Sequence, residues 1–276
     1  PTAAAARTAR RLAVPYVITP RGMLVGELLQ RKSRLVKNAW ISFVERRNLA
    51  HAAAVHFTSK REWDDASALK LPLPHPLVIP NGINPPQDPP STSRDTATIL
   101  FVGRINWKKG LDRLIAALAL LEPGVRLEMA GNDEENYTPS LLALAESRKV
   151  SGRISFLGPV DSDAKSRLLR GATLLVLPSY SENFGNVVLE AMAEALPVVV
   201  TPEVGLASDV ADAQSGVVAN GDPQSLADAI AVLLADATRR SEMGARGRSL
   251  VLQRFTWARV AEEMEAAYEE IARRRP

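Results

Sequence analysis

Two glutamates eight residues apart, Glu182 and Glu190, lie where a predicted buried strand gives way to a helix. Residues 173–177 are apolar and end at a proline, which predicts a buried strand, and a polar loop follows them. Gly185 then opens an amphipathic helix, and residues 196–200 return as a second buried strand. Both carboxylates can line the crevice at the carboxyl end of the first strand, where open α/β sheets bind ligands. We therefore predict a site for a polar ligand.

A second group of polar residues follows the predicted strand at 99–102. Gly103 and Arg104 come first, and Lys108 and Lys109 lie just before Gly110, where a helix begins. A glycine at a strand end lets the backbone approach a ligand, and cations beside a helix amino terminus suit a phosphate or diphosphate. Solvated lysine and arginine are common at such turns, so this pattern alone leaves both interpretations open.

The two groups complement each other chemically. The amides of residues 184–187 lie at a helix start, where they can donate to an anion. Glu182 and Glu190 would repel an anion and are better suited to accept hydrogen bonds from neutral hydroxyls. A diphosphate for the cations and amides, with hydroxyls for the carboxylates, describes a nucleotide-sugar. Either glutamate taken singly is equally compatible with an ordinary solvated acid.

The chain restarts its pattern after a proline-rich segment, residues 84–95, which predicts a stiff linker. Before it we expect helices at 2–13 and 30–48 and strands at 14–19, 53–58 and 77–80. After it, strands alternate with helices that begin at Leu111, Ser140, Ala164, Gly185, Pro223, Thr238 and Thr256, and the strands are at 99–102, 125–129, 153–156, 173–177 and 196–200. This alternation predicts an α/β protein with doubly wound parallel sheets.

The elements divide the chain into unequal parts. Residues 1–83 have about three strands, which predicts a partial amino-terminal Rossmann-like domain, preceded in the parent protein by further elements. Residues 96–255 have enough elements for a complete Rossmann-like domain that binds the ligand. The final helix, residues 256–276, can pack back on the first domain.

Composition narrows the class of protein. The chain has 276 residues and no cysteine, which excludes a disulfide framework and suits a reducing, cytoplasmic compartment. Residues 1–95 carry 14 Lys and Arg against 7 Asp and Glu, whereas the remainder carries 20 against 24. We expect this basic third to meet something anionic, such as the inner face of a membrane, and we expect no nucleic-acid partner. The helix at 30–48 is compatible with a core-facing helix or with an interfacial one.

Three smaller patterns have local interpretations. Asp161 and Asp163 invite a metal interpretation, but they precede a helical pattern and Asp161 suits its cap. Ser59 with Glu62 three residues later predicts a capping box for another helix. The histidines, at positions 51, 56 and 75, lack zinc-ligand spacing and are expected to be packing or surface residues.

These motifs together resemble the group 1 family of retaining glycosyltransferases, family 4, with the GT-B fold. The resemblance rests on Gly-Arg-x4-Lys-Gly from Gly103 and on Pro-Ser-x-x-Glu-x-Phe-Gly-x-x-x-x-Glu-Ala-Met-Ala from Pro178. Similar spacing at 79–82, 196–199 and 255–257 extends it from about Val14 to the carboxyl end. It implies two facing Rossmann-like domains, and the first of them is expected to be incomplete in this chain. It also implies a donor bound mainly by the second domain and an acceptor bound mainly by the first.

The resemblance also implies roles for individual residues. Gly103, Arg104 and Lys109 would bind the diphosphate of a UDP- or GDP-sugar donor, and the two cations would neutralise it as the leaving group. Glu190 would accept from the ribose hydroxyls. The transferred sugar would be held by Glu182 and by the loop and helix start that follow it, namely Asn183, Phe184, Gly185, Asn186 and Val187. Retention in this family is attributed to front-face attack, so no protein nucleophile, metal or cofactor is implied.

The acceptor side departs from the family pattern. Many members have a histidine where the first-domain strand ends, and this chain has Pro20, Arg21 and Gly22 there. Arg21 and Gly22 are therefore the acceptor-side candidates. Ala195 and Leu196 replace the usual glycine before Pro197, which is a local packing change.

Three functions remain open from the sequence. The first is a glycosyltransferase that moves a hexose-type sugar to a glycan or lipid-linked acceptor in cell-surface polysaccharide synthesis. The second is an inactive nucleotide-sugar-binding module, because part of the acceptor domain is expected to lie outside this chain. The third is a sugar-nucleotide epimerase or hydrolase on the same fold.

Overall fold

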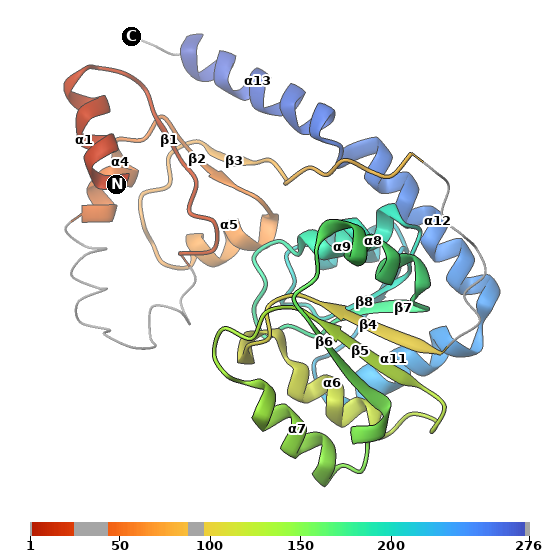
Figure 1. The fold of residues 1–276 in the computed structure, drawn as a ribbon. Helices are drawn as coiled ribbons and strands as arrows, with labels where there is room; N and C mark the ends of the chain where they lie inside the picture. The colour runs from red at the N-terminus through yellow and green to blue at the C-terminus, as the bar shows by residue number, and fades with distance from the viewer. Residues whose placement is uncertain (1, 25–43, 88–96, 274–276) are drawn as a thin grey trace. The chain divides into compact units, whose positions relative to one another are not determined.

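The computed structural model describes residues 2–24, 44–87 and 97–273 of the chain. It divides by contacts into two units (Figure 1). The first unit takes the chain up to Gly82 and resumes at Trp257, and the second unit runs from Ile83 to Thr256. No helix among the described residues combines the length and apolar character needed to span a bilayer.

The first unit is a three-stranded parallel sheet with the order β1-β2-β3. Its strands are β1 (Val17–Ile18), β2 (Ala54–Phe57) and β3 (Pro76–Val78). Its helices are α1 (Thr2–Arg11), α4 (Arg46–Ala50), α5 (Lys60–Ser67) and α13 (Trp257–Arg273). The strand β2 is buried along its whole length and packs with Leu49 and Ala66 of the neighbouring helices. The final helix packs through Val260 and Ala267 on Ile79.

The structure confirms the serine half of the predicted capping box at the start of α5. Ser59 accepts a hydrogen bond from the amide of Glu62 at 3.1 Å, as a helix cap should. The carboxylate of Glu62 accepts from the Thr58 amide at 2.7 Å and from the Gly22 amide at 2.6 Å. One oxygen of this carboxylate therefore bonds Thr58, the residue before the cap, and the other makes a tertiary contact with the turn at Gly22.

The second unit is built on a six-stranded parallel sheet with the order β6-β5-β4-β7-β8-β9. Its strands are β4 (Thr98–Val102), β5 (Arg126–Ala130), β6 (Ile154–Gly158), β7 (Leu174–Leu177), β8 (Val198–Val200) and β9 (Gly216–Val218). Its α-helices are α6 (Leu111–Leu118), α7 (Thr138–Ser147), α8 (Ser162–Gly171), α9 (Asn186–Ala193), α10 (Ala207–Asp212), α11 (Pro223–Ala235) and α12 (Ala237–Arg254).

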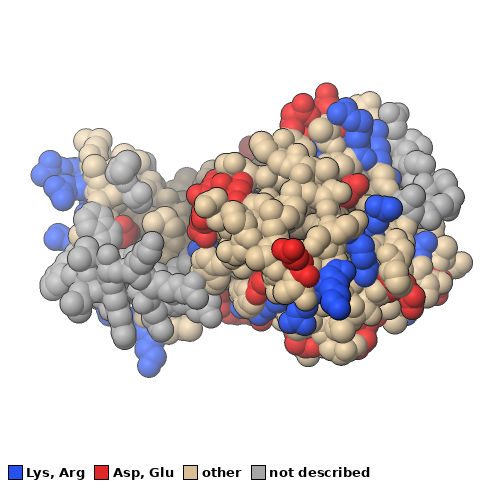
Figure 2. Space-filling model, turned by 60° about the horizontal axis from the view of Figure 1, so that its bottom comes forward, with Lys and Arg blue, Asp and Glu red and all other residues tan. Residues whose placement is uncertain are grey.

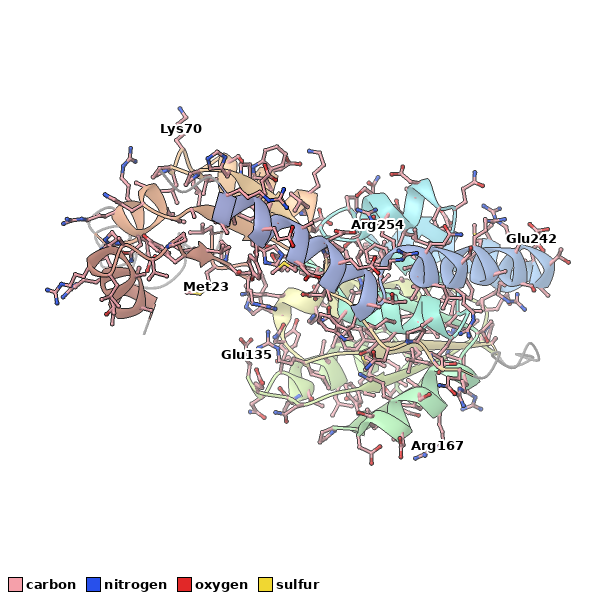
Figure 3. The ribbon with its side chains drawn as sticks, turned by 90° about the horizontal axis from the view of Figure 1, so that it is seen from above. Met23, Lys70, Glu135, Arg167, Glu242 and Arg254 are labelled. Atoms are coloured by element: carbon pink, nitrogen blue, oxygen red, sulfur yellow. The ribbon has the colours of Figure 1, made fainter. Side chains whose placement is uncertain are left out.

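Helices cover both faces of this sheet. Figure 1 shows α6, α7 and α11 on one face and α8, α9 and α12 on the other. The central strands β7 and β8 are fully buried and consist of Leu and Val, as expected for a sheet that is covered on both sides. The predicted doubly wound parallel architecture is confirmed here. Arg254, labelled in Figure 3, lies at the end of α12. It forms a salt bridge of 2.6 Å with Asp209, which links α12 to α10.

The sequence expectations and the structure differ in a few elements. The sequence did not predict α10 or the edge strand β9, both of which are short. The first expected strand, at 14–19, is reduced to two residues. Most of the expected helix at 30–48 and most of the linker at 84–95 lie outside the described residues.

Candidate functional site

The strand order of the second unit creates a switch point between β4 and β7. The chain runs outward from β4 through β5 to β6, then returns to β7 and runs outward to the opposite edge. The connections after β4 and β7 therefore run in opposite directions from the sheet, and in open α/β sheets ligands bind in the crevice expected at such a switch point. These two loops, together with the helix α9 that follows β7, contain the residues predicted to bind the donor.

Glycines bring the backbones of this region into close approach. At Gly110, φ is +65°, and an added Cβ would lie 2.0 Å from the carbonyl oxygen of Pro178 at the end of β7. At Gly131, φ is +154°, and a Cβ would lie 1.8 Å from the carbonyl oxygen of Gly103. The loop after β4 is thus packed tightly between its two neighbours, and larger residues at these positions would force it to move.

Lys109 and Glu182 form an ion pair across the switch point. The Nζ atom of Lys109 hydrogen-bonds Oε2 of Glu182, from the loop after β4 to the loop after β7. The two side chains are 15% and 18% exposed, so the pair is largely shielded from water. The sequence assigned these groups to different parts of a ligand, and the structure shows them in direct contact. An anion that binds Lys109 would compete with the Glu182 carboxylate for it.

The other two charged candidates pair elsewhere. Arg104 is well exposed, and its Nη1 atom hydrogen-bonds Oε2 of Glu134, in the loop after β5, at 3.1 Å. Glu190 lies on the second turn of α9 and accepts from Nζ of Lys165, on α8, at 2.7 Å. Sequence reasoning missed both partners, because each pair joins residues at least 25 positions apart and no local pattern links them.

The loop after β7 is held by the loop after β8. The Glu182 amide donates to the Glu203 carbonyl at 3.1 Å, and the Gly205 amide donates to the Glu182 carbonyl at 2.9 Å. Leu206 donates in the same way to the Phe184 carbonyl at 3.1 Å. These bonds fix the backbone of residues 182–184 immediately before α9 begins, which presents the start of that helix to the crevice.

The remaining donor-binding candidates occupy this fixed segment and the first turn of α9. Phe184 is buried and packs edge-on against Phe255 at 6.4 Å, so its ring belongs to the core. Gly185 has a φ of +97° and caps α9. Asn183 precedes these residues, and Asn186 and Val187 begin the helix. The amino end of an eight-residue helix favours negative charge, which suits a phosphate.

A tyrosine that the sequence did not single out ties the two loops together. The Tyr180 amide donates to the Lys108 carbonyl at 2.7 Å, and the Tyr180 hydroxyl donates to Oδ2 of Asp112 at 2.8 Å. The guanidinium of Arg113 lies 3.4 Å from the centre of the Tyr180 ring. Burial, reinforced by the Asp112 carboxylate, raises the pKa of Tyr180 above its ordinary value. These contacts hold the Lys109 side of the crevice against the Glu182 side.

The metal interpretation of Asp161 and Asp163 finds no support in the geometry. Asp161 caps α8, because its side chain accepts from the Ala164 amide at 2.7 Å, and this confirms the cap prediction. Within the described ranges, no three His, Asp or Glu side chains gather as a metal site would require. His56 is buried, with its ring nitrogens 3.3 Å from the Thr19 hydroxyl and 2.8 Å from the Ile79 carbonyl. It is a packing residue.

The acceptor-side candidates occupy a turn at the carboxyl end of β1. Arg21 and Gly22 have positive φ angles of 49° and 77°, and the Met23 amide closes the turn on the Pro20 carbonyl at 3.1 Å. Glu62 anchors this turn through the Gly22 amide. The Arg21 side chain is exposed. The turn belongs to the first unit, whereas all the donor-binding candidates belong to the second.

Comparison with protein-family models matches nearly the whole chain. Residues 87–250 match the model "Glycosyl transferases group 1", and residues 1–82 match "Glycosyl transferase 4-like domain". A D-inositol 3-phosphate glycosyltransferase of Xylanimonas cellulosilytica is 34% identical over 218 residues, which cover 72% of this chain and 52% of that protein. The protein of the same name from Mycolicibacterium smegmatis is 35% identical over 178 residues, which cover 63% of this chain and 40% of that protein. The chain thus spans about half the length, or less, of these curated relatives.

Solved structures also resemble the chain. Sucrose-phosphate synthase from Thermosynechococcus elongatus superposes with a TM-score of 0.82 at 25% identity, covering 96% of this chain and 71% of that one. HepE from Anabaena, in complex with UDP and glucose, superposes with a TM-score of 0.81 at 21% identity, and the match covers 98% of this chain and 75% of HepE. These neighbours are GT-B glycosyltransferases, so the fold implied by the sequence resemblance is confirmed.

Proposed function

The chain belongs to the group 1 family of glycosyltransferases, and we propose that its protein transfers a sugar, with retention, from a nucleotide diphosphate-sugar. The observation that carries this proposal is the Lys109–Glu182 pair at the switch point of the second unit. The pair joins a cation, which suits a diphosphate, to a carboxylate, which suits the hydroxyls of a sugar. Such a pair suits a ligand that carries both kinds of group side by side.

The chemistry of the reaction matches these residues. As the glycosidic bond to the diphosphate breaks, negative charge grows on the departing diphosphate and positive character grows at the anomeric carbon. Lys109, Arg104 and the amino end of α9 stabilise the departing diphosphate through charges that are already in place. Glu182 accepts from hydroxyls of the transferred sugar, and Glu190 accepts from the ribose. The acceptor hydroxyl attacks from the face that the diphosphate leaves, and the proposal assigns no covalent nucleophile to the protein.

The donor is proposed to be a UDP- or GDP-sugar, bound without a metal or cofactor. The complex of HepE with UDP and glucose supports a nucleotide-sugar of this kind. A thermal-shift screen of UDP- and GDP-sugars tests it, because a ligand that binds only the folded state raises the melting temperature. A shift with one nucleotide and none with the other would assign the base. No shift with any nucleotide-sugar would contradict the donor proposal.

The acceptor is proposed to be a glycan or a lipid-linked sugar in cell-surface polysaccharide synthesis. A phosphorylated small polyol is a second candidate, supported by the names of the inositol 3-phosphate enzymes and of sucrose-phosphate synthase. The excess of Lys and Arg in residues 1–95 supports a negatively charged acceptor or membrane on the cytoplasmic side. Arg21 and Gly22 are the proposed acceptor contacts.

A transfer assay separates this function from its alternatives. Donor and candidate acceptors are incubated with this chain and with a form extended at its amino terminus, and products are identified by mass spectrometry. A glycosylated acceptor with retained anomeric configuration supports the proposal. Product from the extended form alone would make this chain a nucleotide-sugar-binding module. Turnover of the donor without any acceptor would indicate an epimerase or hydrolase.

A further inference from the structure

The first unit contains a basic pocket lined by none of the residues to which the proposed reaction gives a role. It has a volume of about 590 Å³ and lies between α1 and α4. Its lining residues are Ala3, Arg7, Arg10, Arg11, Val44, Arg47 and Asn48. Four of these seven are arginines and none is acidic. Figure 2 shows Lys and Arg atoms gathered at the edge of the first unit that carries α1.

Three of the four arginines have no carboxylate partner among the described residues. The ion pairs of the first unit join other residues, namely Lys60 with Asp64, Arg61 with Asp65, Arg259 with Glu262, and Arg273 with Glu269. None of these pairs involves Arg7, Arg11 or Arg47, whose charges are therefore not neutralised within the described part of the unit. Like charges gathered around one pocket repel each other, and an anion would relieve this repulsion.

The fourth arginine is held in place by neutral groups. The Nη1 atom of Arg10 donates to the Tyr16 hydroxyl at 3.2 Å and to Oδ1 of Asn48 at 3.1 Å. The Tyr16 hydroxyl in turn donates to the Asn48 carbonyl at 2.7 Å. These bonds orient the Arg10 guanidinium but leave its positive charge intact. A fixed cation loses little conformational freedom when it binds a ligand, which favours binding.

Asn48 provides a second, independent indication of a ligand. Its side chain lines the pocket and the residue is 2% exposed. Oδ1 is bonded to Arg10, whereas the buried Nδ2 has no hydrogen-bond acceptor in the described parts of the chain. Buried amide donors are nearly always satisfied, so an acceptor atom from outside this set is expected at Nδ2. An oxygen of a bound anion would be such an acceptor.

We propose that this pocket binds a phosphate or diphosphate group. The guanidinium fork matches the oxygens of phosphate, and several guanidinium groups around one pocket can share its two negative charges. The group can come from the headgroup of an anionic lipid or from a soluble phosphorylated molecule. The same contacts recognise both. This site is separate from the donor site, whose residues all lie in the second unit.

The test uses two double variants of the whole chain that each remove two positive charges. Arg7→Gln with Arg11→Gln removes them from the pocket, on α1. Arg61→Gln with Arg259→Gln removes them from other helices of the same unit and is the matched control. Binding is measured by co-sedimentation with phosphatidylcholine vesicles that contain phosphatidic acid, and by calorimetry with inorganic pyrophosphate.

The pocket variant should bind roughly 30-fold more weakly than the control, since each arginine near an anionic surface contributes about a fivefold factor. Loss in the vesicle arm alone assigns the pocket to a lipid headgroup, and loss with pyrophosphate assigns it to a soluble phosphate. Equal binding by the two variants, or no binding by the unaltered chain in either arm, would overturn the proposal.

Two measurements keep this test independent of folding and of the proposed reaction. Because Arg7 and Arg11 have no described partner, the pocket variant should melt within about 1 °C of the control. Both variants keep Arg104 and Lys109, so their affinities for UDP should be equal. An altered UDP affinity in the pocket variant alone would also count against a separate site.

Discussion

Replacing Lys109 should weaken the binding of a nucleoside diphosphate, and removing Glu182 should partly restore it. Lys109→Met removes a cation from the diphosphate and leaves the Glu182 carboxylate, which is 18% exposed, without its partner. The lost charge-assisted hydrogen bond is worth about 2 kcal/mol. The carboxylate left behind repels a phosphate about 6 Å away by roughly 3 kcal/mol at an effective dielectric constant near 20. Together these effects predict UDP binding at least ~1,000-fold weaker.

The same reasoning predicts opposite behaviour for the other member of the pair. Glu182→Gln releases Lys109 and removes a negative charge, so UDP should bind as tightly as before or up to about tenfold more tightly. The double variant should bind UDP about 100-fold better than Lys109→Met alone, because the repulsive carboxylate is gone. A UDP-sugar should behave differently, because Glu182→Gln also weakens a contact with the sugar.

This double-mutant cycle is measured by isothermal titration calorimetry of the unaltered chain, the two single variants and the double variant with UDP. GDP is used instead if UDP gives no binding signal. A second titration with the corresponding nucleotide-sugar separates the diphosphate contact from the sugar contact. The reasoning is refuted if Glu182→Gln weakens UDP binding as much as Lys109→Met does, with additive effects in the double variant. The pair would then be a structural link between two loops and would not face the donor.

Three further predictions concern the framework of the second unit. Gly131→Ala should destabilise it by about 3 kcal/mol, because a Cβ there meets the Gly103 carbonyl, and should lower its melting temperature by roughly 10 °C. Gly124→Ala, with no atom near its Cβ, is the control, and equal melting of the two would contradict the close approach. Asp161→Ala removes the cap of α8 and should lower the free energy of unfolding by about 1 kcal/mol. The control, Asp163→Ala, should lower it by less than about 0.5 kcal/mol. Equal losses of unfolding free energy in the two variants, measured by chemical denaturation, would contradict the cap. Hydrogen bonds from Thr138 and Tyr137 hold the pKa of Asp133 below its ordinary 3.8, so its contribution to stability is present above pH 3.8 and is lost as pH falls further. Melting temperatures below pH 4 should therefore fall less steeply in Asp133→Asn than in the unaltered chain, and parallel curves would contradict this assignment.

Much of the fold follows from local patterns. The buried strand, loop and helix around Glu182 and Glu190 were predictable because Leu and Val runs, a proline and a glycine mark their boundaries. The strand β9 escaped detection because its three residues are partly buried and follow the short helix α10. The capping box at Ser59 was predictable in its serine half, whereas the position of Gly22, forty residues away, decides where one oxygen of the Glu62 carboxylate goes. Such choices depend on tertiary contacts that a local pattern does not contain.

The candidate site, too, was predictable where local patterns mark it and not where it depends on tertiary contacts. Sequence identified both loops of the switch point and the charged residues in them. It did not identify which charges meet, because the pairing of Lys109 with Glu182 depends on β4 and β7 lying side by side. Lys165 and Glu134 were missed for the same reason. Tyr180 was missed because an aromatic residue in a polar loop carries no signal of its own, and its role emerges only from its contacts with Lys108 and Asp112.

The central claim is that the second unit binds the nucleotide of a sugar donor, with Glu190 on the ribose hydroxyls. Calorimetric titration of Glu190→Ala with the nucleotide-sugar that gives the largest thermal shift tests it most directly. Glu146→Ala, an exposed glutamate on α7, is the matched control. Losing a carboxylate that accepts from hydroxyls should cost about 2 kcal/mol, so affinity should fall roughly 30-fold in Glu190→Ala and stay unchanged in the control. Affinity within twofold of the unaltered chain in both variants would contradict the account.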